Sequence, residues 1–238
     1  MSKKSSRKKK SAVAQQKATP ALRPRKGYLI ASAILLLLFC VLIVMLKTVD
    51  VFPIGPEGSE IGLSGMNGLM LNLLGAHPFW YDLTELFGIL ALAVMLCFGI
   101  VGLLQLIKRK HLRKVDSDLI LLAASYCIVL FFYVLFEILI INYRPILVDG
   151  VLEAAFPSSH TMLVLSVLGT AIPQIERRIS TRLPRVLLIA GCAVLMATTV
   201  LGRLLSGVHW TTDILGGILL SGAVVCCYVG LLPKREKA

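Results

Sequence analysis

Long uncharged apolar stretches recur along this chain, each about the length of a membrane-spanning helix. A helix needs roughly 20 mostly apolar residues to cross the hydrocarbon core of a bilayer. Six segments meet or approach this length, and they predict spanning helices over 27–46, 86–107, 119–143, 157–175, 186–202 and 214–232. The pattern therefore predicts an all-α polytopic membrane protein, and it contains neither an internal repeat nor a boundary to a second folded domain.

Three details refine these predicted helices. The first segment is an uncharged run longer than the 7 to 15 apolar residues of a signal-peptide core, so we expect it to remain as an anchor. The third segment contains a single charge, Glu137, which we expect to lie deep in its helix. Pro173 is expected to kink or end the fourth helix, because proline cannot donate the backbone hydrogen bond.

The composition agrees with this class of protein. Of the 238 residues, 57% are hydrophobic and 16% are charged, and the mean hydropathy is +0.83. Soluble domains carry about 25% charged residues, so an ordinary soluble domain is excluded. We expect a basic, disordered cytoplasmic tail over 1–26, a six-span domain over 27–233 with an outer loop at 47–83, and a short cytoplasmic tail over 234–238.

The positions of the basic residues predict the orientation, because cytoplasmic flanks collect lysine and arginine. With six spans and both termini inside, 22 of the 25 basic residues fall on the cytoplasmic side. Only Lys47, Arg144 and Arg203 remain for the outer side. The ends of the third and fifth helices and the starts of the fourth and sixth are therefore expected to face outward.

The net charge of +12 comes mainly from residues 1–26, which contribute +10 and contain no acidic residue. Such a run is typical of a disordered arm at the anionic inner leaflet. A nucleic-acid partner is not expected, because no aromatic residues alternate with the lysines and no recognisable module follows. The six cysteines lie in predicted helices without zinc-type spacing, so we expect neither a disulfide framework nor a metal site.

Three short segments, "NYRP", "FPSSHT" and "GRLLSGVHWTTD", are expected to meet at the outer face. They carry Arg144, His160, Arg203, His209 and Asp213. An ionisable group costs about 2.5 to 3.5 kcal/mol at the centre of a spanning helix, so such groups usually pair or carry function. A single arginine there is explained by snorkelling and a single histidine by helix capping, whereas the whole set favours a site.

These residue types favour phosphate chemistry. Arginine offers forked donors to phosphate oxygens, and the start of a helix presents free backbone N–H groups to an anion. Ser158 and Ser159 lie at such a start, where either caps the helix or contacts the phosphate. His209 and Asp213 share one face if the sixth helix begins early, and the carboxylate would then orient the imidazole. A zinc site is less favoured, because two arginines repel a cation.

The order Arg-Pro, Pro-Ser-x-His and Arg-x5-His-x3-Asp resembles the three-part signature of the type 2 phosphatidic acid phosphatase (PAP2) superfamily. The number of predicted spans and the outward site also resemble its membrane branch. This resemblance implies that His209 is a nucleophile that forms a phosphohistidine, with Asp213 as its orienting carboxylate. It implies that His160 protonates the leaving group.

The same resemblance assigns the phosphate-binding residues. Arg144, Arg203 and Ser158 would hold the phosphate oxygens, and the backbone amide of Ser159 would stabilise the transition state. It implies no metal ion and no other cofactor.

The sequence departs from the family pattern at three positions. Glu137 stands where the family has a lysine, seven residues before Arg144, and is expected two helical turns below that arginine. It would pair with an arginine, contact a cationic head group or weaken catalysis. Ser159 replaces a glycine and Gly202 replaces a serine, and both changes are small, so an active enzyme is expected.

The outer loop contains "IGLSGMNGLMLNLLG", which predicts a short helix lying at the membrane interface. Its broadly apolar face comprises Ile61, Leu63, Met66, Leu69, Met70, Leu73 and Leu74. Such a helix either covers the bundle or guides a lipid tail to the site, and the pattern fits both.

We therefore expect hydrolysis of a lipid phosphate or diphosphate at the outer face of a plasma membrane, in a compact chain of bacterial type. The resemblance allows undecaprenyl diphosphate, phosphatidylglycerophosphate or phosphatidic acid as substrate, and no feature indicates the oligomeric state. The alternatives are a membrane protein that binds lipid phosphates without turnover, and a transporter. A transporter predicts charges at mid-bilayer depth and an internal repeat.

Overall fold

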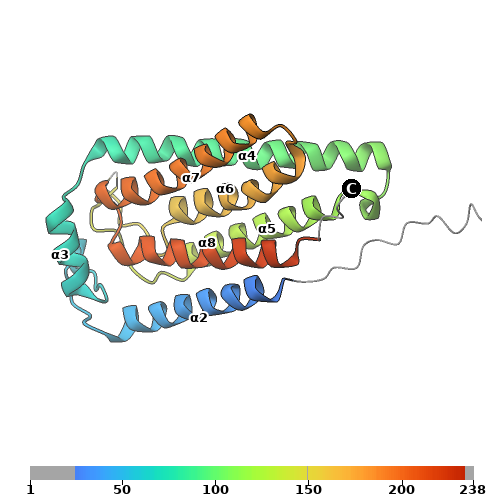
Figure 1. Cartoon of the computed structure of the whole chain (residues 1–238). Helices are drawn as coiled ribbons and strands as arrows, with labels where there is room; N and C mark the ends of the chain where they lie inside the picture. Colours follow the sequence, from blue (N-terminus) through green and yellow to red (C-terminus); the bar gives the residue numbers. More distant parts are fainter. Residues whose placement is uncertain (1–24, 149, 234–238) are drawn as a thin grey trace, which may run out of the picture.

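The computed structural model describes residues 25–148 and 150–233. Nearly all of the predicted basic tail and all of the predicted C-terminal tail lie outside these residues. The described residues form seven α-helices and no β-strand (Figure 1). The helices are α2 (Lys26–Thr48), α3 (Ser64–Leu74), α4 (Pro78–Arg109), α5 (Ser117–Ile138), α6 (Ser159–Arg178), α7 (Arg182–Leu205) and α8 (Thr211–Leu231), with short 3₁₀ turns at Pro56–Gly58 and Leu112–Lys114.

Within the described residues, five helices, namely α2, α4, α5, α7 and α8, are long and apolar enough to cross a membrane. Helix α6 has 20 residues but is less apolar, and it packs against α4, α5, α7 and α8 (Figure 1). Its Ser166, Thr170 and Gln174 side chains are completely buried. The lower hydropathy of α6 therefore follows from its place at the centre of the bundle, where it meets protein rather than lipid.

Helix α5 ends at Ile138, whereas the hydrophobic pattern extends to residue 143. The following chain instead pairs with itself, since Arg144 N–H donates to Glu153 O at 3.0 Å and Ala155 N–H donates to Asn142 O at 2.9 Å. Pro145 also disfavours helical backbone at the residue before it. Glu137 thus lies one residue from the end of α5, and the prediction that it lies deep, two helical turns below Arg144, is wrong.

Two other predicted boundaries also differ. Helix α4 begins at Pro78, so the loop predicted at 47–83 ends at His77; proline suits a first helical position because its missing N–H would have no partner there. Helix α6 continues through Pro173 to Arg178, so the proline does not end it. Proline removes a single backbone bond, and the turn after it is held by the buried Gln174, whose Nε2 contacts Tyr228 Oη in α8.

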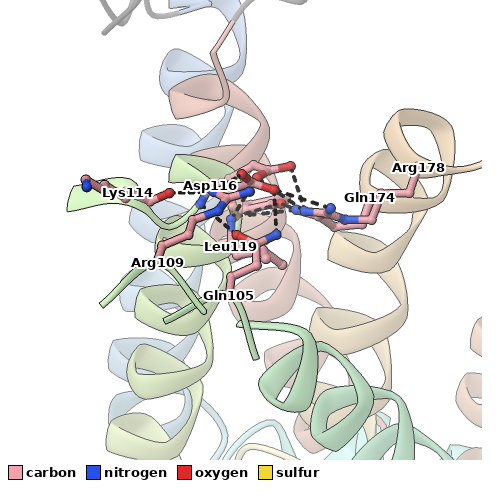
Figure 2. Close-up of polar contacts among 9 residues, drawn as sticks. Gln105, Arg109, Lys114, Asp116, Leu119, Gln174 and Arg178 are labelled. Atoms are coloured by element: carbon pink, nitrogen blue, oxygen red, sulfur yellow. Dashed lines mark hydrogen bonds and ion pairs between the residues drawn. The ribbon is translucent and has the colours of Figure 1, made fainter. Parts of the chain in front are cut away.

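We call the end of the bundle where α6 and α8 begin the site end, and the opposite end the basic end. At the basic end Arg25 N–H donates to Gly230 O at 2.8 Å, so the described start and finish of the chain lie together. The arginines that end α4 and α6, Arg109 and Arg178, meet Asp116 there (Figure 2), and Arg178 also meets Asp118. Arg109 lies 2.8 Å from Asp116, and Arg178 lies 3.2 Å from Asp118 and 3.6 Å from Asp116.

The Asp116 carboxylate at the start of α5 also accepts a hydrogen bond from Gln105 Nε2 at 2.7 Å. Partial burial opposes the charged form of Asp116, but the hydrogen bonds from Arg109 and Gln105 and the charge of Arg178 together hold its pKa below the usual range. The network therefore ties α4, α5 and α6 together at the basic end with charges of both signs.

A helix is present in the predicted outer loop: α3, which crosses the site end of the bundle (Figure 1). Asn67 anchors it, because its Nδ2 donates to Thr212 Oγ1 at 3.0 Å and its Oδ1 accepts from Thr212 N at 3.3 Å. Met66, Leu69 and Leu73 point outward and are exposed. Helix α3 is thus fixed to the first turn of α8.

Candidate active site

The five ionisable residues expected at the outer face all lie at the site end of the bundle. His160 is in the first turn of α6, Arg203 is in the last turn of α7, and Asp213 is in the first turn of α8. His209 lies in the loop between α7 and α8, and Arg144 lies in the extended segment after α5. The fold therefore gathers residues from three separate stretches of sequence.

The loop that carries His209 turns at Gly207, which has a φ of +71°. A Cβ at this position would lie 2.4 Å from the Cβ of Ala76, so the loop approaches the link between α3 and α4 closely. Glycine alone adopts this backbone freely and leaves room for the approach. The turn places His209 directly before α8.

His209 and Asp213 lie side by side, with 3.6 Å between His209 Nδ1 and Asp213 Oδ2. Helix α8 begins only at Thr211, so the two residues do not share a helix face as the early start would require. Their proximity comes from the helix cap: Asp213 Oδ2 accepts the backbone N–H of Trp210 at 2.8 Å, and Asn142 Nδ2 donates to Oδ1 at 3.4 Å. The cap fixes the completely buried carboxylate beneath the histidine.

The His209 side chain is 2% exposed, and neither ring nitrogen has a hydrogen-bond partner among the described residues. Burial lowers the pKa of His209 well below its usual range, and the positive charges of Arg203 and Arg144 lower it further. The imidazole is therefore neutral at pH 7 and keeps a lone pair, as a nucleophile requires.

Arg203 is almost completely buried. Its Nη1 donates to Thr84 Oγ1 at 3.3 Å and its Nη2 to Glu85 Oε1 at 3.1 Å, both on α4. The guanidinium carbon lies 5.4 Å from the centre of the Tyr81 ring. Its Nε has no partner among the described residues. One face of α4 therefore fixes this arginine while leaving one donor open.

His160 contacts both Glu85 and Arg203. Its Nε2 lies 3.0 Å from Glu85 Oε2, and its Nδ1 contacts Arg203 Nη2. Sequence reasoning missed Glu85, because it lies between the predicted loop and the predicted second helix. The signal that could have found it is a carboxylate at the edge of an apolar run, where it needs a cationic partner.

Arg144 pairs with Glu153, a second acidic residue that sequence reasoning missed. Arg144 Nη2 lies 3.2 Å from Glu153 Oε2, and the two residues also share a backbone hydrogen bond. The Nε of Arg144 is buried and has no partner among the described residues. The arginine is thus held from one side and has one donor unused.

The two serines of "FPSSHT" have different places. Ser158 is the N-cap of α6, and its Oγ accepts from Thr161 N at 3.4 Å and from Thr161 Oγ1 at 3.1 Å. Its own N–H donates to Asp213 O at 2.9 Å and so joins the starts of α6 and α8. Of the two roles expected for these serines, capping is the one that Ser158 performs here, while Ser159 lines the two cavities described next.

A small cavity beside the site is lined by Glu137, Ser159 and His209, with aromatic side chains around them. The position at which this sequence departs from the family lysine therefore lies in the same cavity as the predicted nucleophile. Among the described residues, no group of three or more His, Cys, Asp or Glu side chains is arranged to hold a metal ion.

A larger cavity of about 580 Å³ lies between α4, α5 and α6. Glu85, Ser159 and His160 line it together with apolar side chains that include Ile89, Leu92 and Leu130. The side chains of Ile89, Leu92 and Leu130 are more than half exposed on the outside of the bundle, so the cavity reaches the surface that meets lipid. A second apolar cavity of about 320 Å³ shares Tyr126 with it and continues between α4 and α5.

Buried arginines and histidines lie together at one end of a bundle of apolar helices, as in a membrane protein with a polar site, and comparison identifies the family. Residues 119–237, half of the chain, match the sequence profile of the PAP2 superfamily. The chain therefore belongs to the PAP2 superfamily, as the three motifs predict.

A solved structure shares the fold. It is the crystal structure described as the first transmembrane PAP2 type phosphatidylglycerolphosphate phosphatase from Bacillus subtilis. The two chains superpose with a TM-score of 0.59 and 18% identity, over 83% of this chain and 93% of the other. No curated protein sequence matches this chain.

Proposed function

We propose that this protein is a metal-independent lipid phosphatase that works through a phosphohistidine. The observation that carries the proposal is a group of three buried nitrogens that make no hydrogen bond among the described residues and are free for a ligand: Arg144 Nε, Arg203 Nε and His209 Nε2. A buried polar group left unpaired costs about 1 to 3 kcal/mol, so such a group points to a ligand. Two guanidinium groups beside a neutral imidazole suit a phosphate.

The first half of the reaction transfers the phosphoryl group to the protein. Asp213 lies nearest to Nδ1 of His209, which leaves Nε2 to attack phosphorus. The N–P bond forms as the bond between phosphorus and the lipid oxygen breaks, and His160 donates its proton to that oxygen. The arginines stabilise the negative charge on the phosphoryl oxygens, and the amide of Ser159 and the hydroxyl of Ser158 are proposed to assist them.

The second half returns the protein to its starting state. Water attacks phosphorus, the N–P bond breaks, and His160 accepts a proton from the water. Inorganic phosphate and the dephosphorylated lipid are the products. The positive charge that a metal ion supplies in other phosphatases comes here from Arg144 and Arg203.

The proposed substrate is a lipid because the cavity of about 580 Å³ joins the site to the lipid-facing surface. A phosphate on Arg203 and His160 would leave the tail of the lipid along apolar side chains between α4 and α5. A phosphate head and an apolar tail are shared by phosphatidylglycerophosphate, phosphatidic acid and undecaprenyl diphosphate. The similar solved structure is described as a phosphatidylglycerolphosphate phosphatase, which supports the first of these three lipids.

We also propose six spans, with both termini in the cytoplasm and the site on the extracytoplasmic face of the plasma membrane. The described ends of the chain lie together with Arg109 and Arg178 at the basic end, opposite the site. Cytoplasmic flanks collect such residues. Helix α6, shielded from lipid by its neighbours, would be the fourth span in chain order, and it would bring the five apolar helices to six spans.

Glu137 favours a second candidate, in which the protein binds lipid phosphates or moves them without hydrolysis. Its carboxylate lines the cavity of His209 and would repel a phosphate there. A transporter with charges at mid-bilayer depth is less favoured, because Glu137 lies at the end of α5.

The test is phosphate release by the purified protein in detergent with a metal chelator, using diphosphate and monophosphate lipids. We expect chelator-resistant release that falls at least about a thousandfold in His209→Ala, because removing a nucleophile removes the covalent path. His111→Ala is the matched control, since His111 is exposed at the basic end and should keep full activity. Absence of release from every lipid by the folded wild-type protein would instead support binding without turnover.

A further inference from the structure

Glu85 in the third turn of α4 holds two groups of the proposed site at once. Its Oε1 lies 3.1 Å from Arg203 Nη2 and its Oε2 lies 3.0 Å from His160 Nε2. Its carboxylate thereby joins α4 to the start of α6 and the end of α7. None of the three sequence motifs contains this residue.

The two oxygens of Glu85 lie on two groups that the proposed reaction assigns to the substrate. In the proposed reaction, Arg203 holds a phosphoryl oxygen and His160 gives its proton to the leaving oxygen. Arginine binds carboxylates and phosphates in the same forked geometry. One carboxylate oxygen lies on the arginine and the other on the histidine, so Glu85 presents its oxygens as a phosphate ester would.

The surrounding side chains make the carboxylate the movable partner. The Arg203 side chain is 1% exposed and is also held by Thr84, whereas the Glu85 side chain is 38% exposed and lines the large cavity. A Cβ at Gly88 would lie 2.8 Å from Cδ2 of His160, so the absence of a side chain at Gly88 lets the imidazole pack directly against α4. The arginine and histidine are therefore fixed, while the glutamate has space to turn away.

We propose that Glu85 is an internal mimic of the substrate, which occupies the phosphate subsite on Arg203 and His160 and is displaced when the lipid phosphate binds. The proposal rests on the function proposed above and adds the residue that sets substrate affinity. A carboxylate that stayed beside the bound phosphate would repel it strongly in a site shielded from water. Displacement removes this repulsion and frees both groups for the substrate.

The test compares the affinity of inorganic phosphate for the wild-type protein and for Glu85→Gln, by calorimetry in detergent. Glutamine keeps the size of the side chain but loses the charge-assisted bonds, so we expect phosphate to bind about tenfold more tightly. Asp82→Asn is the matched control, because Asp82 is an exposed acid one turn earlier in α4 and should leave the affinity unchanged. Unchanged or weaker binding in Glu85→Gln overturns the proposal.

Steady-state kinetics separate displacement from a permanent positioning role. Displacement predicts a lower KM for the lipid phosphate in Glu85→Gln, and Glu85→Ala should show the same direction. A residue that positions His160 during the reaction would instead lower kcat at constant KM, and that result overturns the mimic. Thermal unfolding of each variant checks that the fold is intact.

The two proposals fail in different ways. If the wild type releases phosphate but Glu85→Gln binds inorganic phosphate no more tightly, the mimic is wrong and the phosphatase stands. If no variant hydrolyses any lipid but Glu85→Gln tightens phosphate binding, the mimic stands and the phosphatase is wrong.

Discussion

Glu137 is the residue at which this chain differs most from its family in charge. It lies one residue before the end of α5 and lines the small cavity that contains Ser159 and His209. A negative charge in this place opposes an incoming phosphate, whereas the family lysine would attract it. The departure is therefore expected to act on substrate binding rather than on the fold.

Glu137→Lys is expected to lower KM for a phosphate-bearing lipid about fivefold to tenfold, because it replaces a negative charge that repels phosphate with an ammonium group that donates hydrogen bonds to it. Steady-state phosphate release in detergent measures this change. Glu60→Lys makes the same change at an exposed position of the outer loop and should leave KM unchanged. A higher KM in Glu137→Lys would show that Glu137 contacts a cationic part of the head group.

The chemistry of single residues could be predicted where spacing carries it. The motif arginines and histidines and Asp213 were found from their order along the chain, and the structure places them at one end of the bundle. Their roles remain predictions. Glu85 and Glu153 could not be found in this way, because their partners are far away in sequence and only packing brings them together.

Between elements, the contact of α4 with α7 depends on Gly202, which replaces the family serine. A Cβ at Gly202 would lie 2.6 Å from Cγ2 of Thr84 and 3.1 Å from Cε3 of Trp80. Trp80 and Thr84 thus fill the space that a serine side chain would take. The neighbouring Arg203 donates to Thr84, so this close contact also positions the arginine.

Gly202→Ser is expected to destabilise the protein by about 1 to 3 kcal/mol and to lower activity, because overpacking pushes α4 away from α7. Thermal unfolding in detergent and phosphate release measure the two effects. Adding Thr84→Ser removes the clashing methyl group but keeps the hydroxyl for Arg203, so the double variant should recover part of both. Gly191→Ser is the control in the same helix, because its Cβ would meet nothing within 4 Å. A Gly202→Ser protein as stable as wild type would contradict the packing argument.

The helices themselves were largely predictable, since the length and hydropathy of an apolar segment identify a spanning helix. The predictions differ from the structure at the ends of some helices, and hydropathy is a weaker guide to the helix at the centre of the bundle. Helix α5 stops early because residues after Ile138 pair with a segment that follows them, and α6 is less apolar because protein surrounds it. Hydropathy reports contact with lipid, so it describes peripheral helices better than a central one.

At the scale of the whole molecule, the bundle has a site end and a basic end. If the site faces outward, Glu60 in the first loop is extracytoplasmic and His111 after α4 is cytoplasmic. Both are exposed and can be replaced by cysteine in a chain whose six native cysteines have been changed to alanine.

We expect a membrane-impermeant maleimide to label the Glu60→Cys variant in intact cells and to label the His111→Cys variant only after the membrane is permeabilised. The asymmetry of basic residues is the physical reason. Labelling of both variants in intact cells would contradict the proposed orientation. The reverse pattern would place the site in the cytoplasm.

The order of residues along the chain was enough to define its class, the family and the side chains that would handle a phosphate, because these depend on local composition and on fixed spacings. The local cap of α8 sets Asp213 beside His209, and packing alone decided that Glu85 reaches both His160 and Arg203. It also placed Glu137 in the cavity of the predicted nucleophile. Such contacts join segments up to 118 residues apart, so they depend on how the helices meet rather than on any local pattern.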